Sequence, residues 1–533
     1  MHSYPLTVKQ LMTGAMDRFA TRTALVFDGA EYTYAELSER ANRLGNALVS
    51  LGVRPGDPVG LLLPNGVDYV VADQAIVRIG AAKVPLNDMS SAKDIAYCLA
   101  DSRAEVVISE ADMLAAACDS GSPHLRLVIA CDDAAPSDSP VRVLSLAEAV
   151  AGAADTLPTA AASEQDVALI MYTGGTTGRS KGVVHRQFGL AQNLLSHLIE
   201  TSLQADDRAL LMTPLPHSAG FLMQTAFLAG ATVLLEQKFD PELALRRISE
   251  DGVSFTFMVP TMIYRVLDAA AGRELDLSSL RTVLYGAAPI TRDRLEQGLE
   301  VLGPVFMQIY GQSEAPNFIT RLRREDHSCD PAGSHRLASC GQAVTMARVK
   351  IVDPDDPARP ELPVGQVGEV AALTPYTMDG YWQLPEVTGK SLQDGWLYTG
   401  DLGRLDDEGY LYLLDRKNDL IISGGMNVYS SEVETVIALV EGIERVSVVG
   451  IPHADWGEAV VACIVPDSHV DLAELKARVV EACRRDLSRY KVPKSVIAFG
   501  ELPVTAYGKI DKKALRAGIQ QTHESSTEKG TDR

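Results

Sequence analysis

Residues 172–182 read Tyr172-Thr173-Gly174-Gly175-Thr176-Thr177-Gly178-Arg179-Ser180-Lys181-Gly182 and follow an apolar run, Val167 to Met171, that predicts a buried strand. Glycine lets backbone N–H groups face a ligand, threonine adds hydroxyl donors, and lysine adds a positive charge. Such a segment suits phosphate oxygens. The spacing is not that of the Walker P-loop, in which the lysine directly follows a glycine, because Ser180 precedes Lys181 here. The sequence predicts a phosphate loop of another kind, with a polar surface turn as the alternative.

The composition is that of a globular protein of more than one domain. The chain has 533 residues, of which 46% are hydrophobic and 22% charged, and this length exceeds one ordinary core. The net charge of −21 argues against a nucleic-acid partner, which requires basic surface. An anionic substrate must therefore be held by local donors.

The compartment expected from the sequence is the cytoplasm. The seven cysteines are scattered, without a Cys-x-x-Cys pair, which is typical of free thiols in a reducing environment. The first residues lack the basic start and apolar block of a signal peptide. The most apolar stretch, Phe221 to Leu235, is too short to span a bilayer, so we expect it in the core and expect no integral membrane segment.

The N-terminal part alternates helix and strand patterns, which favours parallel sheets covered by helices. Thr33-x-x-Glu36 predicts a capping box at the start of a helix, and a second region of this kind extends from about Asp206 to Gly311. From Val349 to Glu369, proline, glycine and β-branched residues predict antiparallel strands. A charged cluster at 415–419 precedes a separate α+β pattern. We therefore expect domains at 1–415 and 420–533 joined by a hinge at 416–419, with a disordered tail from about Thr522.

Three further motifs carry groups that suit a nucleotide. Tyr310-Gly311-Gln312-Ser313-Glu314 offers an aromatic ring, a hydroxyl and a carboxylate that can hold Mg²⁺. Tyr398-Thr399-Gly400-Asp401 offers a carboxylate for ribose hydroxyls, and Gly508-Lys509 offers a cation on a turn. Taken singly, these motifs favour an ordinary strand end, an aspartate in a strand connection and a solvated lysine.

Together, the motifs resemble the ANL superfamily of adenylate-forming enzymes, which includes acyl-CoA synthetases, peptide-synthetase adenylation domains and luciferases. The resemblance extends from about Tyr32 to Arg516. It includes five more segments in the family's order, namely Pro214–Gly220, Tyr285–Pro289, Gly365–Glu369, Ser423–Tyr429 with Glu432, and Pro452–Glu458. It implies an α/β fold with a large N-terminal domain of layered, mostly parallel sheets, a small distorted antiparallel barrel, a hinge and a small α+β C-terminal domain.

The resemblance also implies roles for individual residues. It implies that ATP is bound by Thr173, Gly174, Gly175, Thr176, Thr177, Gly178, Lys181, Gly286, Ala287, Ala288, Pro289, Tyr310, Gly311, Asp401 and Arg416. It implies that Ser313 contacts the α-phosphate, Glu314 holds Mg²⁺ and Lys509 bridges the carboxylate and phosphoryl oxygens during adenylation. The acid and coenzyme A would be met by His217, Phe221, Gly341, Gly424 and Gly425, and Asn418 falls at the hinge.

Four positions depart from the family pattern. Gly174 stands where serine is frequent and Ser180 where proline is frequent, which predicts a less rigid loop with one hydroxyl fewer. Asn418 replaces a commonly charged hinge residue, and Ser430 replaces a usual proline. Quantitative differences are therefore expected in phosphate affinity and domain rotation.

The expected function is that of an acyl-CoA synthetase. It would use ATP and Mg²⁺ to convert a carboxylic acid to an acyl-adenylate, release pyrophosphate and transfer the acyl group to coenzyme A. Amino-acid-activating members carry an aspartate shortly after the position of His217, whereas no acid occurs here before Glu236, so an acid without an α-amino group is favoured. The alternatives are an adenylation-only or carrier-protein-directed enzyme, and a non-catalytic nucleotide-binding protein on the same fold.

Overall fold

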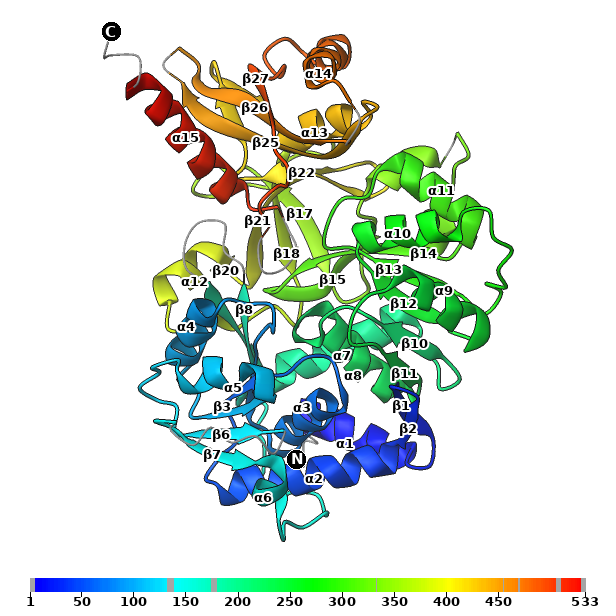
Figure 1. The fold of residues 1–533 in the computed structure, drawn as a ribbon, viewed down its shortest axis with the longest axis vertical. Helices are drawn as coiled ribbons and strands as arrows, with labels where there is room; N and C mark the ends of the chain where they lie inside the picture. The colour runs from blue at the N-terminus through cyan, green and yellow to red at the C-terminus, as the bar shows by residue number, and fades with distance from the viewer. Residues whose placement is uncertain are drawn as a thin grey trace.

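Four sheets organise the chain, as Figure 1 shows for a computed structural model. The structure describes residues 5–131, 139–173, 180–331, 333–453, 455–467, 470–504 and 510–528, with side chains described to residue 520. The N-terminal sheets lie below, an antiparallel sheet lies in the middle, and the C-terminal unit lies above (Figure 1).

The largest sheet has nine strands in the order β16-β15-β14-β13-β12-β10-β11-β1-β2, and its central pairs from β1 to β14 are parallel. Its strands are β1 (Thr23–Phe27), β2 (Ala30–Thr33), β10 (Arg208–Leu211), β11 (Thr232–Leu235), β12 (Phe255–Met258), β13 (Thr282–Tyr285), β14 (Phe306–Gln312), β15 (Ala315–Leu322) and β16 (Gln342–Ala343). The central strands are apolar runs buried on both faces, as is usual for parallel strands covered by helices.

The second sheet has eight strands in the order β19-β9-β8-β4-β3-β5-β6-β7 and is parallel from β8 to β7. Its strands are β3 (Pro58–Leu62), β4 (Ala82–Pro85), β5 (Val106–Ser109), β6 (Leu127–Ala130), β7 (Arg142–Ser145), β8 (Val167–Thr173), β9 (Lys181–Arg186) and β19 (Gly380–Tyr381). The predicted mostly parallel architecture is confirmed.

Helices separate and cover these two sheets. They are α1 (Val8–Arg18), α2 (Tyr34–Ser50), α3 (Val67–Ile79), α4 (Ala92–Ser102), α5 (Ala111–Cys118), α6 (Leu146–Val150), α7 (Gln187–Thr201), α8 (Gly220–Ala229), α9 (Pro241–Glu250), α10 (Pro260–Ala270), α11 (Arg292–Leu302) and α12 (Pro385–Ser391). The capping box at α2 is confirmed, because the Thr33 hydroxyl accepts from the Glu36 N–H while the Glu36 carboxylate accepts from the Thr33 N–H.

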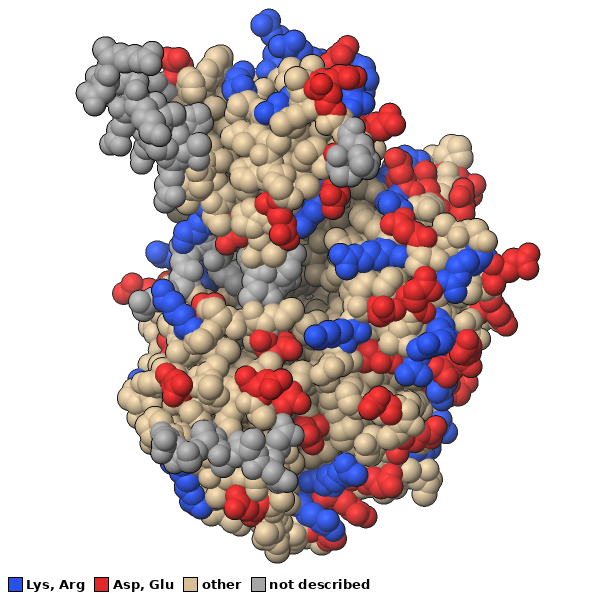
Figure 2. Space-filling view, viewed as in Figure 1, with Lys and Arg blue, Asp and Glu red and all other residues tan. Residues whose placement is uncertain are grey.

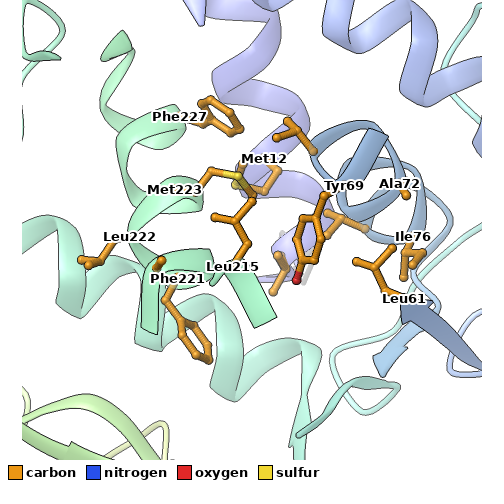
Figure 3. Packing of buried hydrophobic residues seen from close by; sticks show 14 of the residues in the cluster. Met12, Leu61, Tyr69, Ala72, Ile76, Leu215, Phe221, Leu222, Met223 and Phe227 are labelled. Atoms are coloured by element: carbon orange, nitrogen blue, oxygen red, sulfur yellow. The ribbon is translucent and has the colours of Figure 1, made fainter. Parts of the chain in front are cut away.

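The core between the sheets is aromatic and methionine-rich. Figure 3 shows Met12 of α1, Tyr69 of α3, and Met223 and Phe227 of α8 converging around Leu215. The stretch 221–235 forms α8 and β11, and its buried side chains confirm the prediction that it belongs to the core. Among the described helices, none has the length and apolar character needed to cross a membrane.

The third sheet is antiparallel throughout and corresponds to the small antiparallel barrel predicted for the N-terminal domain. It is a curled five-stranded sheet in the order β17-β18-β21-β20, with β22 also paired to β21. Its strands are β17 (Arg348–Val352), β18 (Gly368–Leu373), β20 (Leu392–Gln393), β21 (Trp396–Leu405) and β22 (Leu411–Arg416).

The C-terminal unit has its own sheet and core. Strands β23 (Ile421–Ser423), β24 (Met426–Val428), β25 (Ile443–His453), β26 (Gly457–Pro466) and β27 (Ser495–Ala498) are covered by α13 (Ser430–Ala438), α14 (Leu472–Asp486) and α15 (Lys512–Glu528). Val433, Val448, Val460, Leu475 and Val479 pack together at its centre. Helix α15 continues past Thr522, where a disordered tail was expected, because no glycine or proline interrupts the chain between Ile519 and Glu528.

Candidate active site

The turn between β14 and β15 gathers most of the predicted nucleotide residues. Strand β14 carries Tyr310, Gly311 and Gln312, and the turn itself is Ser313 and Glu314. A Cβ on Gly311 would lie 2.6 Å from the backbone carbon of Asn317, so the two strands require glycine at this point. This close packing fixes the backbone positions of the neighbouring Tyr310 and Gln312.

Asp401 lies at the centre of a hydrogen-bonded cluster with Tyr310 and Arg416. The Tyr310 hydroxyl donates to Oδ2 of Asp401 over 2.6 Å, and Nε of Arg416 lies 2.7 Å from Oδ1. Antiparallel pairing of β21 with β22 sets Asp401 opposite Arg416. Burial raises the pKa of Tyr310 well above its usual range and the Asp401 carboxylate raises it further, so the hydroxyl stays a donor. The structure thus brings together three residues that are scattered in the sequence.

The Ser313–Glu314 turn is held by strands β9 and β19. Nε2 of His185 lies 2.8 Å from the Ser313 carbonyl oxygen, and the Met378 N–H donates to the Glu314 carbonyl over 2.7 Å. The Tyr381 hydroxyl donates to Oε1 of Glu314 over 2.6 Å. Burial lowers the pKa of His185 to about 4, so this imidazole is neutral near pH 7 and Nε2 carries the proton that it donates. Glu314 is thereby fixed through both backbone and side chain.

The segment 286–289 follows β13 and lies beside β14. A Cβ on Gly286 would come 2.6 Å from the Ile309 carbonyl oxygen, which explains glycine there. Ala287 has a φ of 68°, a left-handed conformation that costs a non-glycine residue energy. Gly286 is buried, whereas Ala287, Ala288 and Pro289 are exposed. The structure therefore brings this predicted ATP-binding segment next to the strand that carries Tyr310.

His217 lies at a kink within the short π-helix η1 (Leu215–Ala219), with φ −116° and ψ −148°. Its Nε2 lies 3.2 Å from the amide nitrogen of Asn87, which follows β4 and is buried. The buried Asn317 amide reaches Nε2 of His197 at 2.9 Å and the Ser218 carbonyl at 3.5 Å. This arrangement anchors the segment next to His217 to strand β15.

Phe221, at the start of α8, forms an aromatic group with His197 and Phe318. The rings of His197 and Phe221 are stacked with centroids 5.8 Å apart, and Phe318 meets His197 edge-on at 4.8 Å. Burial lowers the pKa of His197 to about 4, so the ring is neutral near pH 7. The predicted acid-binding residue Phe221 therefore packs against uncharged groups.

Gly341 packs directly against the backbone of Arg321 in strand β15. Its φ is 78°, and a Cβ would overlap the Arg321 backbone. Among the described contacts, none joins Gly341 to His217 or Phe221, so its predicted part in substrate binding remains a prediction.

Several predicted residues lie outside the described part of the chain, namely Gly174, Gly175, Thr176, Thr177, Gly178 and Lys509. The residues that flank them are described. Ser180 hydrogen-bonds through its hydroxyl to the Thr173 carbonyl, and the Tyr97 hydroxyl donates to the Ser180 carbonyl over 2.9 Å. Val504 and Ile510 form an antiparallel bridge on either side of 505–509.

The predicted hinge lies in the turn between β22 and β23, where Asn418 is exposed. The Lys417 ammonium donates to the Pro354 carbonyl over 2.9 Å and lies 3.6 Å from Oε2 of Glu369, both in the antiparallel sheet region. Asp419 instead pairs with Arg516 of α15 at 2.8 Å. Within 416–419, the contacts therefore change from the N-terminal domain to the C-terminal unit across Asn418.

Gly424 and Gly425 form the turn between β23 and β24, with φ values of 61° and 77°. A Cβ on Gly424 would lie 3.2 Å from the Trp456 ring. Both glycines belong to the C-terminal unit, and no described contact joins them to Asp401 or Glu314. Figure 2 shows that the surface is recessed between the C-terminal unit and the N-terminal sheets.

Sequence reasoning missed the residues that support the site. Tyr381, His185 and Asn87 contact the predicted site residues Glu314, Ser313 and His217, and each lies more than 65 positions from its partner. Asn317 hydrogen-bonds to Ser218, next to His217, from 99 positions away. The one available signal was Asn317, a polar residue that follows Glu314 closely at the start of a mostly apolar strand.

The comparisons with known proteins agree with this geometry. The family model described as AMP-binding enzyme matches residues 13–382, and that of the AMP-binding enzyme C-terminal domain matches residues 432–509. The medium/long-chain-fatty-acid–CoA ligase FadD8 of Mycobacterium tuberculosis is 35% identical over 95% of this chain and 89% of that protein. A feruloyl-CoA synthase of Amycolatopsis sp is 37% identical over 93% of this chain and 95% of that protein.

Among solved structures, ATP-bound MatB from Rhodopseudomonas palustris has a TM-score of 0.85 at 28% identity and covers 96% of this chain and 99% of its own. The chain belongs to the AMP-binding enzyme family, the ANL superfamily of adenylate-forming enzymes. It is an AMP-forming ligase of the acyl-CoA synthetase type.

Proposed function

We propose that ATP binds with its ribose on Asp401, its adenine between the 286–289 segment and Tyr310, and its phosphates on residues 173–181. Ser313 would contact the α-phosphate at the end of the same turn. The single observation that carries this proposal is the Tyr310–Asp401–Arg416 cluster, because it holds a buried carboxylate beside an aromatic ring on the strand that leads to Ser313 and Glu314. Such a carboxylate can accept from both ribose hydroxyls.

Glu314 is proposed to hold Mg²⁺. It is buried, and among the described residues no cation pairs with its carboxylate. No group of three metal-ligating side chains occurs in the described ranges, so the ion would need phosphate oxygens for its other ligands, which is common for Mg²⁺. When bound, Mg²⁺ offsets the negative charge of the phosphates.

Lys509 is proposed to supply the second positive charge. A carboxylate is repelled by the α-phosphate that it must attack, so preorganised cations lower the barrier, each by an amount equivalent to about 10²–10³ in rate. The thiol step would require this lysine to leave and the thiol of coenzyme A to reach the acyl group near His217. The change of contacts across Asn418 supports a rotation there, after which Gly424 and Gly425 would lie near the pantetheine arm.

The acid is proposed to be apolar and to lack an α-amino group. Glu236, the first acid after His217, pairs with Arg247 at 2.8 Å and so is not available for an ammonium group. Phe221 and the neutral His197 offer an uncharged wall. An apolar acyl group is also what the fatty-acid and feruloyl names of the relatives describe for those proteins.

Coenzyme A is proposed as the acceptor, with an acyl carrier protein as the alternative, and the cytoplasm as the location. The location is supported by the cysteines, all seven of which are free and five of which are buried.

Pyrophosphate release measured with a panel of carboxylic acids, with and without coenzyme A, tests the proposal. We expect release with medium-chain and aromatic acids, none with amino acids, and an acyl-CoA product when coenzyme A is present. Lys509→Ala should abolish adenylation while ATP still binds. Unchanged turnover in that variant, or no acyl-adenylate with any acid, would contradict the proposal.

The same assay separates the alternatives. An adenylation-only enzyme would release pyrophosphate without forming acyl-CoA, and a carrier-directed enzyme would require a phosphopantetheinyl protein. A non-catalytic nucleotide-binding protein would bind ATP and release nothing.

A further inference from the structure

Tyr381 contacts two groups that the proposed function assigns to ATP. Its hydroxyl donates to Oε1 of Glu314 over 2.6 Å, and the ammonium of Lys181 lies 4.2 Å from the centroid of its ring. Tyr381 is 8% exposed and Glu314 is 9% exposed, so their hydrogen bond and the Tyr381 ring are shielded from water, whereas the Lys181 side chain is partly exposed. Shielding strengthens a hydrogen bond to a carboxylate and a cation–π contact alike.

Backbone pairing fixes Tyr381 in this position. Strand β19 pairs with β9 so that Tyr381 lies opposite Val183, two residues after Lys181. Strand β9, which leaves the phosphate loop, is therefore paired with the strand whose Tyr381 reaches the Ser313–Glu314 turn. Met378, three residues before Tyr381, holds the Glu314 carbonyl through its N–H at 2.7 Å.

We propose that Tyr381 is a positioning residue that orients the magnesium-binding carboxylate with its hydroxyl and the phosphate-loop lysine with its ring. The inference rests on the proposed function, because it takes Glu314 as the metal ligand and Lys181 as the phosphate contact. The Tyr381 hydroxyl donates to Oε1 of Glu314, and in the described part of the chain no hydrogen bond or ion pair reaches Oε2 of Glu314. Holding one oxygen limits rotation of the carboxylate before the metal binds, as outer partners of metal ligands commonly do.

The two contacts use different parts of the side chain, so substitutions can separate them. Tyr381→Phe removes only the hydroxyl, whereas Tyr381→Leu also removes the ring. Tyr34→Phe is a matched control, because Tyr34 is fully buried and its hydroxyl also donates over 2.6 Å, to the Ala231 carbonyl in the core.

The test is calorimetric titration of ATP in EDTA and at a series of Mg²⁺ concentrations, which reads binding and not turnover. For Tyr381→Phe we expect the Mg²⁺ concentration that gives half-maximal enhancement of ATP binding to rise about tenfold, which corresponds to the loss of one hydrogen bond to a charged group. The affinity for ATP in EDTA should be unchanged. Tyr381→Leu should show the same metal shift and, in addition, about threefold weaker ATP binding in EDTA. Tyr34→Phe should keep the wild-type metal dependence.

A Tyr381→Phe protein that melts like Tyr34→Phe and has the wild-type Mg²⁺ dependence would overturn the inference and leave the proposed function intact. If ATP binding by the wild-type protein does not depend on Mg²⁺, both the inference about Tyr381 and the proposed function would be overturned. Lys181→Met gives a second test that leaves Tyr381 in place. It should weaken ATP binding in EDTA without moving the Mg²⁺ midpoint, and a moved midpoint would contradict the separate roles of ring and hydroxyl.

Discussion

Nε2 of His185 lies 2.8 Å from the carbonyl oxygen of Ser313, and this contact joins strand β9 to the turn that carries Glu314. His185 is 1% exposed, so loss of the imidazole leaves the Ser313 carbonyl buried without this donor. An unsatisfied buried carbonyl costs about 1–3 kcal/mol, and here it would also release the turn.

We therefore predict that His185→Ala lowers acid-dependent ATP–pyrophosphate exchange by about tenfold. His185→Gln should recover most of the rate, since a glutamine amide can donate to the same carbonyl. His327→Ala is the matched control, because His327 is also buried but hydrogen-bonds to Tyr285 away from the turn. Equal losses of exchange rate in the His185 and His327 variants would show that the effect is only one of stability.

A buried ion pair lies under α8. Lys83 of β4 pairs with Asp73 of α3, and the Gln224 amide of α8 donates to the same carboxylate over 2.9 Å. Asp73 is fully buried. Lys83→Met leaves this carboxylate without its cation, so we predict a loss of about 3–5 kcal/mol in the free energy of unfolding.

Urea denaturation of the single and double variants measures this loss. Lys83→Met combined with Asp73→Leu should recover much of it, because no unpaired charge then remains. A Lys83→Met protein as stable as the wild type would argue that Asp73 takes up a proton or finds water.

Three buried histidines predict a loss of stability in mild acid. Burial lowers the pKa of His185, His197 and His327 from 6.5 to about 4. Below pH 6.5 these histidines bind protons in the unfolded chain but stay neutral in the folded chain. Their contribution to the free energy of unfolding is therefore complete above pH 6.5 and is lost as the pH falls towards 4. Each histidine should reduce the free energy of unfolding by about 1.4 kcal/mol per pH unit in this window.

Urea midpoints recorded at pH 7, 6 and 5 test this slope. His197→Asn should make it shallower, since one of the three groups is then removed. A midpoint independent of pH across that range would refute the assignment of neutral histidines.

The C-terminal unit is held against the end of β22 by Asp415. Its carboxylate accepts from the Ser430 N–H at the start of α13, where the N-cap residue Tyr429 makes no side-chain cap, and the Ser431 hydroxyl donates to the Leu414 carbonyl. We predict that Asp415→Ala weakens α13 by about 1 kcal/mol and accelerates tryptic cleavage after Arg416 and Lys417.

Asp471→Ala provides the comparison, because Asp471 caps α14 within the C-terminal unit and does not contact the hinge. Limited proteolysis followed by mass spectrometry should show faster hinge cleavage for Asp415→Ala than for Asp471→Ala. Identical cleavage patterns would mean that Asp415 does not hold the two parts together.

Local patterns predicted what depends on local physics. The capping box at Thr33, the buried strand at Val167 to Met171 and the core stretch Phe221 to Leu235 follow from spacing and apolar composition, and the structure has them within a few residues. The motifs around Tyr310 and Asp401 were recognisable only together with the other motifs, because their order along the chain is that of the ANL superfamily.

The supporting contacts could not be predicted because they join distant segments. Tyr381 reaches Glu314 from 67 positions away, and Asn87 reaches His217 from 130 positions away, so only the pairing of β19 with β9 and the path of β4 bring them together. Ser430 was noted only as a departure from the family pattern, whereas in the structure its N–H is the donor that a proline would lack.

The change of contacts across Asn418 also suggests where this enzyme can be divided. Lys417 is anchored to one half and Asp419 to the other, and each half contains its own hydrophobic core. Two co-expressed polypeptides that meet at this point would each retain their anchors, so catalysis would report on their reassembly.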